Sequence, residues 1–310
     1  MRRVNRFFYY LFNKPSVLLL ILLEQISPII PDRIYLEIRY RIVVGKKLNL
    51  NAPKTFSEKL QWLKLYNRKP EYTIMVDKVR AKEYVAAKLG KEFVIPTLGV
   101  WDNPDEIDFS ALPDKFVLKC NHNSGNGMYI CRKKSKMNIV KVKTGLRKGL
   151  KENYFLHGRE WPYKDVPRKV LAEKYLNEAE YEDLRDYKFF CFNGEPVYCQ
   201  VISGRDSVMT VDFFDGNWKH QPFHEPAIFP FSKEVIDRPE NYELMKDLAR
   251  KLAIGLPFVR IDFYNIHGKI YFGEITFFPT SGMGGFDPNE WDLRFGDMIS
   301  IGDVTNRDNS

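Results

Sequence analysis

The sequence predicts an α+β fold in which the sheets are largely antiparallel. Short strand-like runs are mixed with helical stretches, and they do not alternate regularly as they would in a parallel βαβ protein. The 310 residues suffice for a sizeable core and for more than one structural unit. With 44% hydrophobic and 15% aromatic residues, the composition excludes a disordered chain.

Positive charge is concentrated in residues 1–50, which we expect to form a helical lead-in. This segment holds nine Lys and Arg against three Asp and Glu, a net charge of +6, whereas the whole chain carries +8. The asymmetry indicates a basic surface that faces an anionic partner such as a membrane surface, and not a basic catalytic body. We expect no nucleic-acid partner.

The apolar run Val17–Leu23 imitates the core of a signal peptide but is only seven residues long. A spanning helix needs roughly 20 apolar residues, and no small-residue cleavage site follows the run. One interpretation is an interfacial helix on the inner face of the membrane, with the aromatic residues from Phe7 to Phe12 at headgroup depth. The other is a helix packed on the body of a cytoplasmic protein.

The helices after the lead-in have recognisable ends. Thr55 opens a helix, and Glu58 three residues later completes a capping box. A second helix is predicted at 72–89 with Gly90 as its stop, and a third at 241–254. Strand-like runs occupy much of the remainder, at residues 93–101, 115–121, 128–132, 170–176, 187–194, 196–203 and 211–215.

The cysteines lie in these apolar runs and form no CxxC pair. They are Cys120, Cys131, Cys191 and Cys199. This pattern predicts buried reduced thiols in a cytosolic protein, although a metal site that includes the nearby His122 is an alternative.

The segment Val259–Gly284 reads as two strands joined by the turn at 265–268. Alternation places Arg260 and Asp262 on one face of the first strand, and Glu274 and Thr276 on one face of the second. Two carboxylates, a hydroxyl and an arginine suit a hard cation such as Mg²⁺ holding phosphates. The alternative is a solvated sheet face whose charges merely pair.

The segment Phe116–Arg132 predicts a hairpin with a glycine-containing loop. It neither continues into a helix nor ends in Gly-Lys-Ser/Thr, so it is not a Walker-type loop. Backbone N–H groups of the loop could fold over phosphates while Lys119 reaches them. An ordinary hairpin turn is the alternative.

Two further runs suggest a nucleotide hinge. An apolar strand that ends in Glu173-Lys174-Tyr175-Leu176 can present backbone groups and a carboxylate to a purine edge, and the run Asp186–Phe190 follows it. The alternative is a strand edge with solvated charges.

Taken in order, these motifs resemble the ATP-grasp superfamily, and more narrowly the ATP-grasp proteins similar to the teichuronopeptide biosynthesis protein TupA. The matching phrases run through residues 50–285. They are NAPKTFSEKLQWLKLY, VDKVRAKEYV, IPTLGVWDNPDEIDF, LPDKFVLKCNHNSG, DYKFFCFNGEP and VRIDFYNIHGKIYFGEITFFPTSG.

The resemblance implies an ATP-grasp fold that binds ATP between two α+β lobes. It divides the chain into a lead-in (1–50), an N-terminal helical region (51–115), a small lobe (116–180) and a large lobe (181–310). The residues it implies in nucleotide binding are Lys78 and Lys119 at the phosphates, Asn123, Ser124, Gly125 and Gly127 in the closing loop, Glu173, Lys174, Tyr175 and Leu176 at the adenine, and Asp186 or Glu180 at the ribose.

The catalytic end of the site follows from the same resemblance. Arg260 would stabilise the transferring phosphoryl group together with Lys119, and Asp262 and Glu274 would hold Mg²⁺. Thr276 stands where the superfamily usually has an asparagine ligand, which favours one metal ion over two. Lys188 matches a family motif with its role left open, and we count it among the catalytic candidates.

The resemblance implies an ATP-dependent carboxylate–amine ligase with an acylphosphate intermediate, acting in cell-surface or capsular polysaccharide biosynthesis. Its partners would be an anionic polysaccharide or lipid-linked glycan precursor and an amine donor. The five histidines show no catalytic spacing, in agreement with a reaction that needs no protein nucleophile. The alternatives are a glycosyltransferase, an ATP-grasp sugar phosphotransferase and a non-catalytic scaffold.

Overall fold

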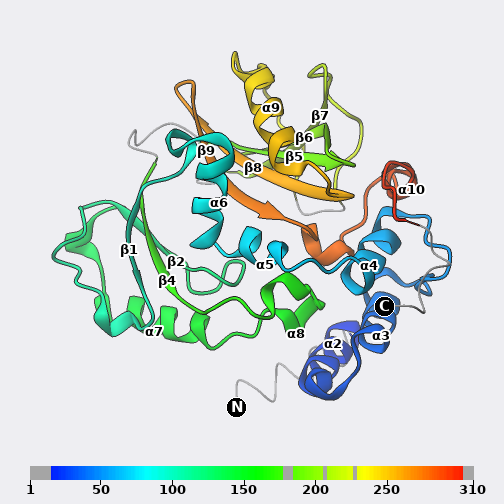
Figure 1. The fold of residues 1–310 in the computed structure, drawn as a ribbon, viewed down its shortest axis with the longest axis horizontal. Coiled ribbons are helices and arrows are strands. Elements are labelled where there is room, and N and C mark those ends of the chain that lie inside the picture. The colour runs from blue at the N-terminus through cyan, green and yellow to red at the C-terminus, as the bar shows by residue number, and fades with distance from the viewer. Residues whose placement is uncertain (1–14, 177–183, 205–207, 226–228, 303–310) are drawn as a thin grey trace.

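Two antiparallel sheets form the framework of the protein (Figure 1). The structure is a computed structural model that describes residues 15–176, 184–204, 208–225 and 229–302. The small sheet has the order β1-β4-β2-β3, with β1 at Thr97–Trp101, β2 at Phe116–Cys120, β3 at Tyr129–Cys131 and β4 at Val170–Lys174. The large sheet has the order β7-β6-β5-β8-β9, with β5 at Asp186–Phe192, β6 at Glu195–Ser203, β7 at Thr210–Asp215, β8 at Phe258–Ile266 and β9 at Lys269–Thr276.

Nine α-helices of the described residues surround these sheets. They are α2 at Pro15–Ile26, α3 at Asp32–Val44, α4 at Phe56–Tyr66, α5 at Glu71–Val76, α6 at Arg80–Leu89, α7 at Ile139–Leu150, α8 at Phe155–Gly158, α9 at Tyr242–Ala253 and α10 at Glu290–Asp297. In Figure 1, α9 lies over the large sheet, and α5 and α6 lie between the two sheets. The mixture of helices with antiparallel strands confirms the predicted α+β fold.

Each sheet has its own core. In the large sheet, Phe189 packs against Tyr242 of α9, with ring centroids 5.7 Å apart, and against Phe263 at 6.0 Å. The core of the small sheet joins Leu118 and Ala172 to Leu146 of α7. Alternate residues of a strand face opposite sides of the sheet. Phe189 and Phe263 face α9, so their neighbours Lys188 and Asp262 lie on the opposite face of the large sheet.

The predicted helix at 72–89 is wrong in one respect, because the structure breaks it at Asp77. The backbone of Asp77 is extended, with φ −69° and ψ 108°, and α5 ends before it. Its carboxylate accepts hydrogen bonds from the backbone N–H of Val79 at 2.9 Å and from the side chain of Asn121 at 2.8 Å. Those bonds stabilise the break, and they leave Lys78 in the connection between the two helices. Gly90 ends α6 at a φ of 119°, as predicted.

The predicted boundary of the small lobe at residue 116 also needs correction. Strand β1 lies before it and pairs with β4, with Thr97 opposite Glu173. The small sheet therefore includes residues from the segment predicted to precede it.

Two other predictions are confirmed. The hydroxyl of Thr55 accepts from the N–H of Glu58, and the Glu58 carboxylate accepts from the N–H of Thr55, so the capping box of α4 is present. All four cysteines are free and buried.

The described part of the lead-in, residues 15–50, forms the two α-helices α2 and α3. On α3, Tyr35, Leu36 and Tyr40 are buried against the body of the protein. On α2, by contrast, Leu22 and Ile26 are about half exposed, at 48% and 52%. In the described part of the chain, no helix is long and apolar enough to cross a membrane. The aromatic residues from Phe7 to Phe12 lie outside the described residues.

Candidate nucleotide site

A row of charged side chains crosses the large sheet on the face turned away from α9. Lys188 on β5 is opposite Asp262 on β8, and Asp262 is opposite Glu274 on β9. The register of β8 and β9 shifts after Asp262, so that Phe263 pairs with Phe272 and Gly273 is left as a bulge. This bulge brings Glu274 opposite Asp262 while Phe272 stays opposite Phe263. The predicted cross-strand placement of Arg260, Asp262, Glu274 and Thr276 is confirmed.

Arg260 joins these residues through its guanidinium. Its Nε and Nη2 donate to the two oxygens of Asp262, both at 2.7 Å. The same Nη2 donates to Glu274 Oε1 at 3.0 Å and to Thr276 Oγ1 at 3.1 Å. Burial opposes the positive charge, but the carboxylates of Asp262 and Glu274 outweigh it and raise the pKa of Arg260. Lys188 pairs with Oδ2 of Asp262, the oxygen that also accepts from Arg260 Nη2, and Asp262 is only 4% exposed.

Three oxygen-bearing side chains thus converge on one point. Asp262, Glu274 and Thr276 all lie within hydrogen-bond distance of the single atom Nη2 of Arg260. Among the residues that the structure describes, no three His, Cys, Asp or Glu side chains gather as a metal site. A cation would therefore depend on two carboxylates and the hydroxyl of Thr276, an oxygen set that fits Mg²⁺ better than a transition metal. The guanidinium of Arg260 would have to withdraw from the centre of that set.

Four cations of the site act on the carboxylate of Glu274. Burial would raise the pKa of Glu274, but Lys78, Arg260, Lys188 and Lys119 together lower it to about 2. The carboxylate is therefore ionised at neutral pH. Its position matters because Glu274 also lines the pocket next to the row.

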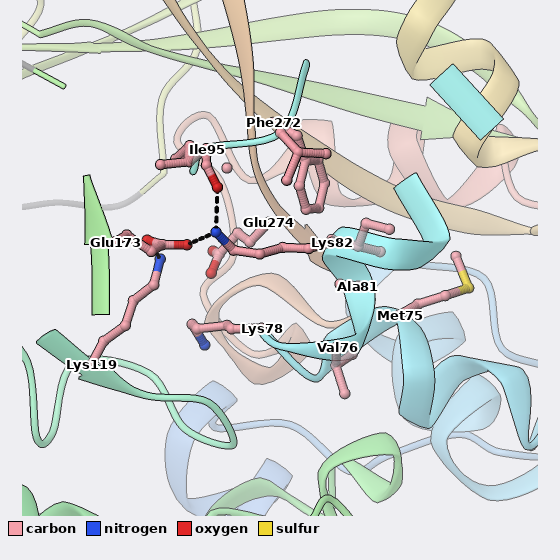
Figure 2. Close-up of a pocket in the computed structure, with 13 residues that line it drawn as sticks. Met75, Val76, Lys78, Ala81, Lys82, Ile95, Lys119, Glu173, Phe272 and Glu274 are labelled. Carbon is pink, nitrogen blue, oxygen red and sulfur yellow. Dashed lines mark hydrogen bonds and ion pairs between the residues drawn. The ribbon is translucent and has the colours of Figure 1, made fainter. Parts of the chain in front are cut away.

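That pocket lies between the two sheets, and Figure 2 shows the amino groups of Lys82 and Lys119 turned toward Glu173. Glu173 ends β4 and accepts from Lys119 Nζ at 2.5 Å and from Lys82 Nζ at 2.6 Å. Lys82 also donates to the carbonyl of Ile95 at 2.6 Å. Burial opposes the ionisation of Glu173, but the two lysines lower its pKa. Burial also lowers the pKa of Lys78 and of Lys82.

The ion cluster fills much of this pocket, and only about 10 Å³ is left open. A purine and its phosphates need far more room. Binding a nucleotide here would therefore require the contacts of Lys82 and Lys119 with Glu173 to open. Both lysines would then be available to phosphate oxygens.

Lys82 is a residue of this pocket that sequence reasoning missed. It follows Lys78 by four residues, a spacing that brings side chains together on a helix, and this was the available signal. The break at Asp77 keeps Lys78 outside α6, yet both side chains line the same pocket.

The glycine-containing segment is a hairpin, as predicted, because β2 and β3 pair on either side of it. Lys78 Nζ donates to the backbone carbonyl of Asn123 at 2.7 Å, which ties the loop to the lysine cluster. Gly125 and Gly127 have φ of 85° and 71°. A Cβ at Gly127 would lie 2.6 Å from Cys120 Sγ, so a side chain there would clash.

The hinge residues lie where they were expected, at the end of β4. The N–H of Lys174 donates to the carbonyl of Pro96 at 3.0 Å, and Tyr175 and Leu176 continue the chain. Asp186 is 2% exposed at the start of β5, and its carboxylate lies 3.6 Å from Lys188 Nζ. Its role at the ribose remains a prediction, and Glu180 lies outside the described residues.

These features match one protein family. Residues 58–300 fit the family model described as TupA-like ATPgrasp. The chain belongs to the TupA-like ATP-grasp family. Membership confirms the resemblance and the predicted ATP-grasp fold. ATP-grasp enzymes use ATP, typically with Mg²⁺. The lysines of the pocket carry the charge that phosphates require, and the oxygen set around Arg260 has the ligand types that Mg²⁺ prefers.

Solved structures with similarity to this ATP-grasp protein include two D-alanine–D-alanine ligases. The ligase from Bacillus anthracis complexed with ATP is 19% identical, with a TM-score of 0.41, over 73% of this chain and 63% of that one. The ligase from Helicobacter pylori is 17% identical, with a TM-score of 0.43, over 80% and 70%. The ATP-grasp ligase PsnB, complexed with a minimal precursor, is 11% identical, with a TM-score of 0.39, over 72% and 60%. The chain thus spans less than two thirds of the Bacillus ligase and of PsnB. No match was found among curated proteins.

Proposed function

We propose that the protein is an ATP-dependent carboxylate–amine ligase. One observation carries the proposal: Glu274 belongs both to the lysine pocket and to the oxygen set around Arg260. A nucleotide whose phosphates lie among Lys78, Lys82 and Lys119 would therefore end beside the residues suited to a metal ion and to the transferred phosphoryl group.

In this reaction a substrate carboxylate oxygen bonds to the γ-phosphorus of ATP, and the bond from that phosphorus to the bridging oxygen of ADP breaks. An amine nitrogen then bonds to the acyl carbon, inorganic phosphate leaves, and the amine gives up a proton. Arg260 and the lysines position and neutralise the phosphoryl oxygens, so no protein nucleophile is needed. Asp262, Glu274 and Thr276 would hold Mg²⁺, which supplies further charge neutralisation.

A thermal-shift screen with ATP, ADP and nucleotide sugars, each with and without Mg²⁺, tests nucleotide choice. By linkage, a ligand at about 100 times its dissociation constant adds about 2.7 kcal/mol to the free energy of unfolding. We expect Mg²⁺-dependent stabilisation by ATP and ADP, and ADP release once an acid and an amine are supplied. Stabilisation by nucleotide sugars alone would favour a glycosyltransferase, and a phosphorylated sugar without an amide would favour a phosphotransferase.

Asp262→Asn tests the metal site directly. We expect turnover to be lost and the Mg²⁺ dependence of ATP binding to disappear, because the variant removes the acid that Arg260 and Lys188 share. Asp247→Asn, at a residue of α9 that is 60% exposed, is the matched control. Unchanged turnover in Asp262→Asn would remove the proposed metal site. Absence of both ATP binding and turnover in the wild-type protein would support a scaffold.

For the substrates, we propose an acidic cell-surface or capsular polysaccharide, or its lipid-linked precursor, together with an amine donor. Two features support this: the resemblance to TupA and the excess of positive charge in residues 1–50. We also propose that the protein works in the cytoplasm, on the inner face of the membrane, with α2 toward the lipid. The exposure of Leu22 and Ile26 supports that orientation.

A further inference from the structure

A second cavity adjoins the oxygen set on Arg260, Glu274 and Thr276. Its volume is 370 Å³, within the range of about 300–1,000 Å³ that is usual for small-ligand pockets. The remaining walls come from distant parts of the chain. They include Arg39 of the lead-in helix α3, His157 of α8, Glu160, and Thr280 and Ser281 after β9.

Arg39 has hydrogen-bonding capacity left over on this wall. Its Nη1 donates to Glu24 Oε1 and to the hydroxyl of Tyr35, both at 3.3 Å. Its Nε is buried and has no hydrogen-bond partner among the described residues. Its Nη2 is not buried and makes no hydrogen bond to the described residues, so an acceptor atom on a ligand in the cavity could bind it.

The floor of the cavity is fixed before any ligand binds. Thr280 and Ser281 adopt left-handed backbone conformations, with φ of 48° and 57°. The fully buried Lys64 holds Ser281 through a hydrogen bond to its carbonyl at 2.8 Å, and it ties this segment to Gly158, whose carbonyl accepts at 2.7 Å. Non-glycine residues keep such strained conformations only where surrounding contacts impose them, often at ligand sites.

The charges on the walls favour an anion. Arg39 and Arg260 supply positive charge, and the hydrogen bond that His157 donates to the Glu24 carboxylate is the largest cause that raises the pKa of His157. Of the two acids, Glu274 already pairs with Arg260. Burial raises the pKa of Glu160 and so favours its neutral form.

We propose that this cavity holds the acceptor substrate and that Arg39 binds a carboxylate of that substrate. The inference rests on the proposed ligase function, since it places the acceptor beside the phosphoryl-transfer residues. The carboxylate belongs to a sugar acid or to an amino acid. Helix α3, and with it the lead-in, is then part of the active site and not only a membrane-facing element.

Carboxylate binding is measured by titrating melting temperature with matched acid and amide probes. D-glucuronate is compared with D-glucuronamide for the sugar acid, and N-acetylalanine with its amide for the amino acid. Each titration is run with and without the non-hydrolysable nucleotide AMPPNP and Mg²⁺. We expect one acid to bind and its amide to fail, and the acid that binds identifies the class.

Three variants separate binding from folding. Arg39→Gln should weaken the acid at least about tenfold, as expected for loss of a charge-assisted hydrogen bond, and leave AMPPNP binding unchanged. Glu24→Gln breaks the same Arg39–Glu24 contact but keeps the guanidinium, so the acid should bind as well as or better than before. Arg33→Gln, at an exposed arginine of the same helix, should behave as wild type.

The proposal is overturned if no acid binds, if the amides bind equally well, or if Arg39→Gln binds the acid as wild type does. Loss of binding in both Arg39→Gln and Glu24→Gln would also overturn it, because the contact would then be purely structural. Failure of the ligase function is distinguishable: AMPPNP would not bind, while the titrations without nucleotide would still report on the acid.

Discussion

At the scale of single residues, the lysine pocket holds more cations than acids, because Lys78, Lys82 and Lys119 line it with only Glu173 and Glu274 as carboxylates among its described lining residues. Glu173 forms ion pairs with both Lys82 and Lys119, and Asp262 forms ion pairs with both Arg260 and Lys188. Buried positive charges held this closely repel one another, and an anionic ligand relieves the repulsion. The arrangement therefore favours binding of a polyphosphate over an empty pocket.

Lys82→Met tests whether the lysine that the sequence did not reveal contacts the nucleotide. We expect ATP affinity to fall about tenfold or more, because one charge-assisted hydrogen bond to phosphate is lost. Lys88→Met is the control, since Lys88 lies on the same helix and its amino group stacks on Tyr84 away from the pocket. Calorimetric titration with ATP and Mg²⁺ measures both, and equal affinities would exclude a role for Lys82.

The lowered pKa of Glu274 predicts a loss of stability in acid. Its folded pKa of about 2 lies below the ordinary 4.5, so the unfolded state binds the proton first as the pH falls. The contribution is complete above about pH 4.5 and is lost between there and about pH 2. Because the side chain is 37% exposed, water screens the cations and we expect only about 1 kcal/mol. Urea unfolding across this window should show a shallower pH dependence in Glu274→Gln than in wild type, and identical slopes would contradict the assignment.

The sequence predicted most of the site at this scale because strand alternation and cross-strand pairing are local rules. Arg260, Asp262, Glu274 and Thr276 meet as expected on two neighbouring strands. Arg39, Glu160 and Ser281 were not predicted, because no local pattern brings α3 next to the end of β9. Their meeting depends on packing between residues more than 100 positions apart.

At the scale of elements, local capping signals predicted the ends of helices correctly. A continuous helical periodicity did not predict the break within a helix. The capping box at Thr55 begins α4 as predicted, and Gly90 ends α6. The break at Asp77 was not predicted because it depends on a hydrogen bond from Asn121. That residue follows β2 of the small sheet and is distant from Asp77 in the sequence. A tertiary hydrogen bond thus overrides a continuous helical pattern and places Lys78 at the site.

Thr55→Ala measures what the capping box contributes. Loss of the cap should lower the free energy of unfolding by about 1 kcal/mol, because the N–H of Glu58 loses its acceptor. Thr144→Ala in α7, where the exposed hydroxyl bonds only to the carbonyl of Val140, is the matched control. Urea unfolding of both variants is the measurement. If Thr55→Ala lowers the free energy of unfolding no more than the control does, the capping box does not stabilise the protein.

At the scale of the whole molecule, the lead-in has two different sides. One side packs on the body of the protein through Tyr35, Leu36 and Tyr40. The other carries an apolar stripe on α2 and the turn after it, with Leu19, Leu22, Ile26 and Ile29 between 48% and 84% exposed. The spacing of three and four residues places these side chains on one face of a helix. Such a stripe beside basic residues is typical of an interfacial helix.

The double variant Leu22→Ser/Ile26→Ser tests that face. We expect co-sedimentation with anionic phospholipid vesicles to fall several-fold, since about 0.8 kcal/mol of binding is lost for each CH₂ group no longer buried in lipid. ATP binding should stay unchanged, because neither residue lines the nucleotide pocket. Val235→Ser removes an apolar residue that is 86% exposed elsewhere, and it should sediment as wild type. If the double variant sediments as wild type while neutral and anionic vesicles bind equally, the stripe does not face a membrane, and the lead-in acts only through α3 and Arg39.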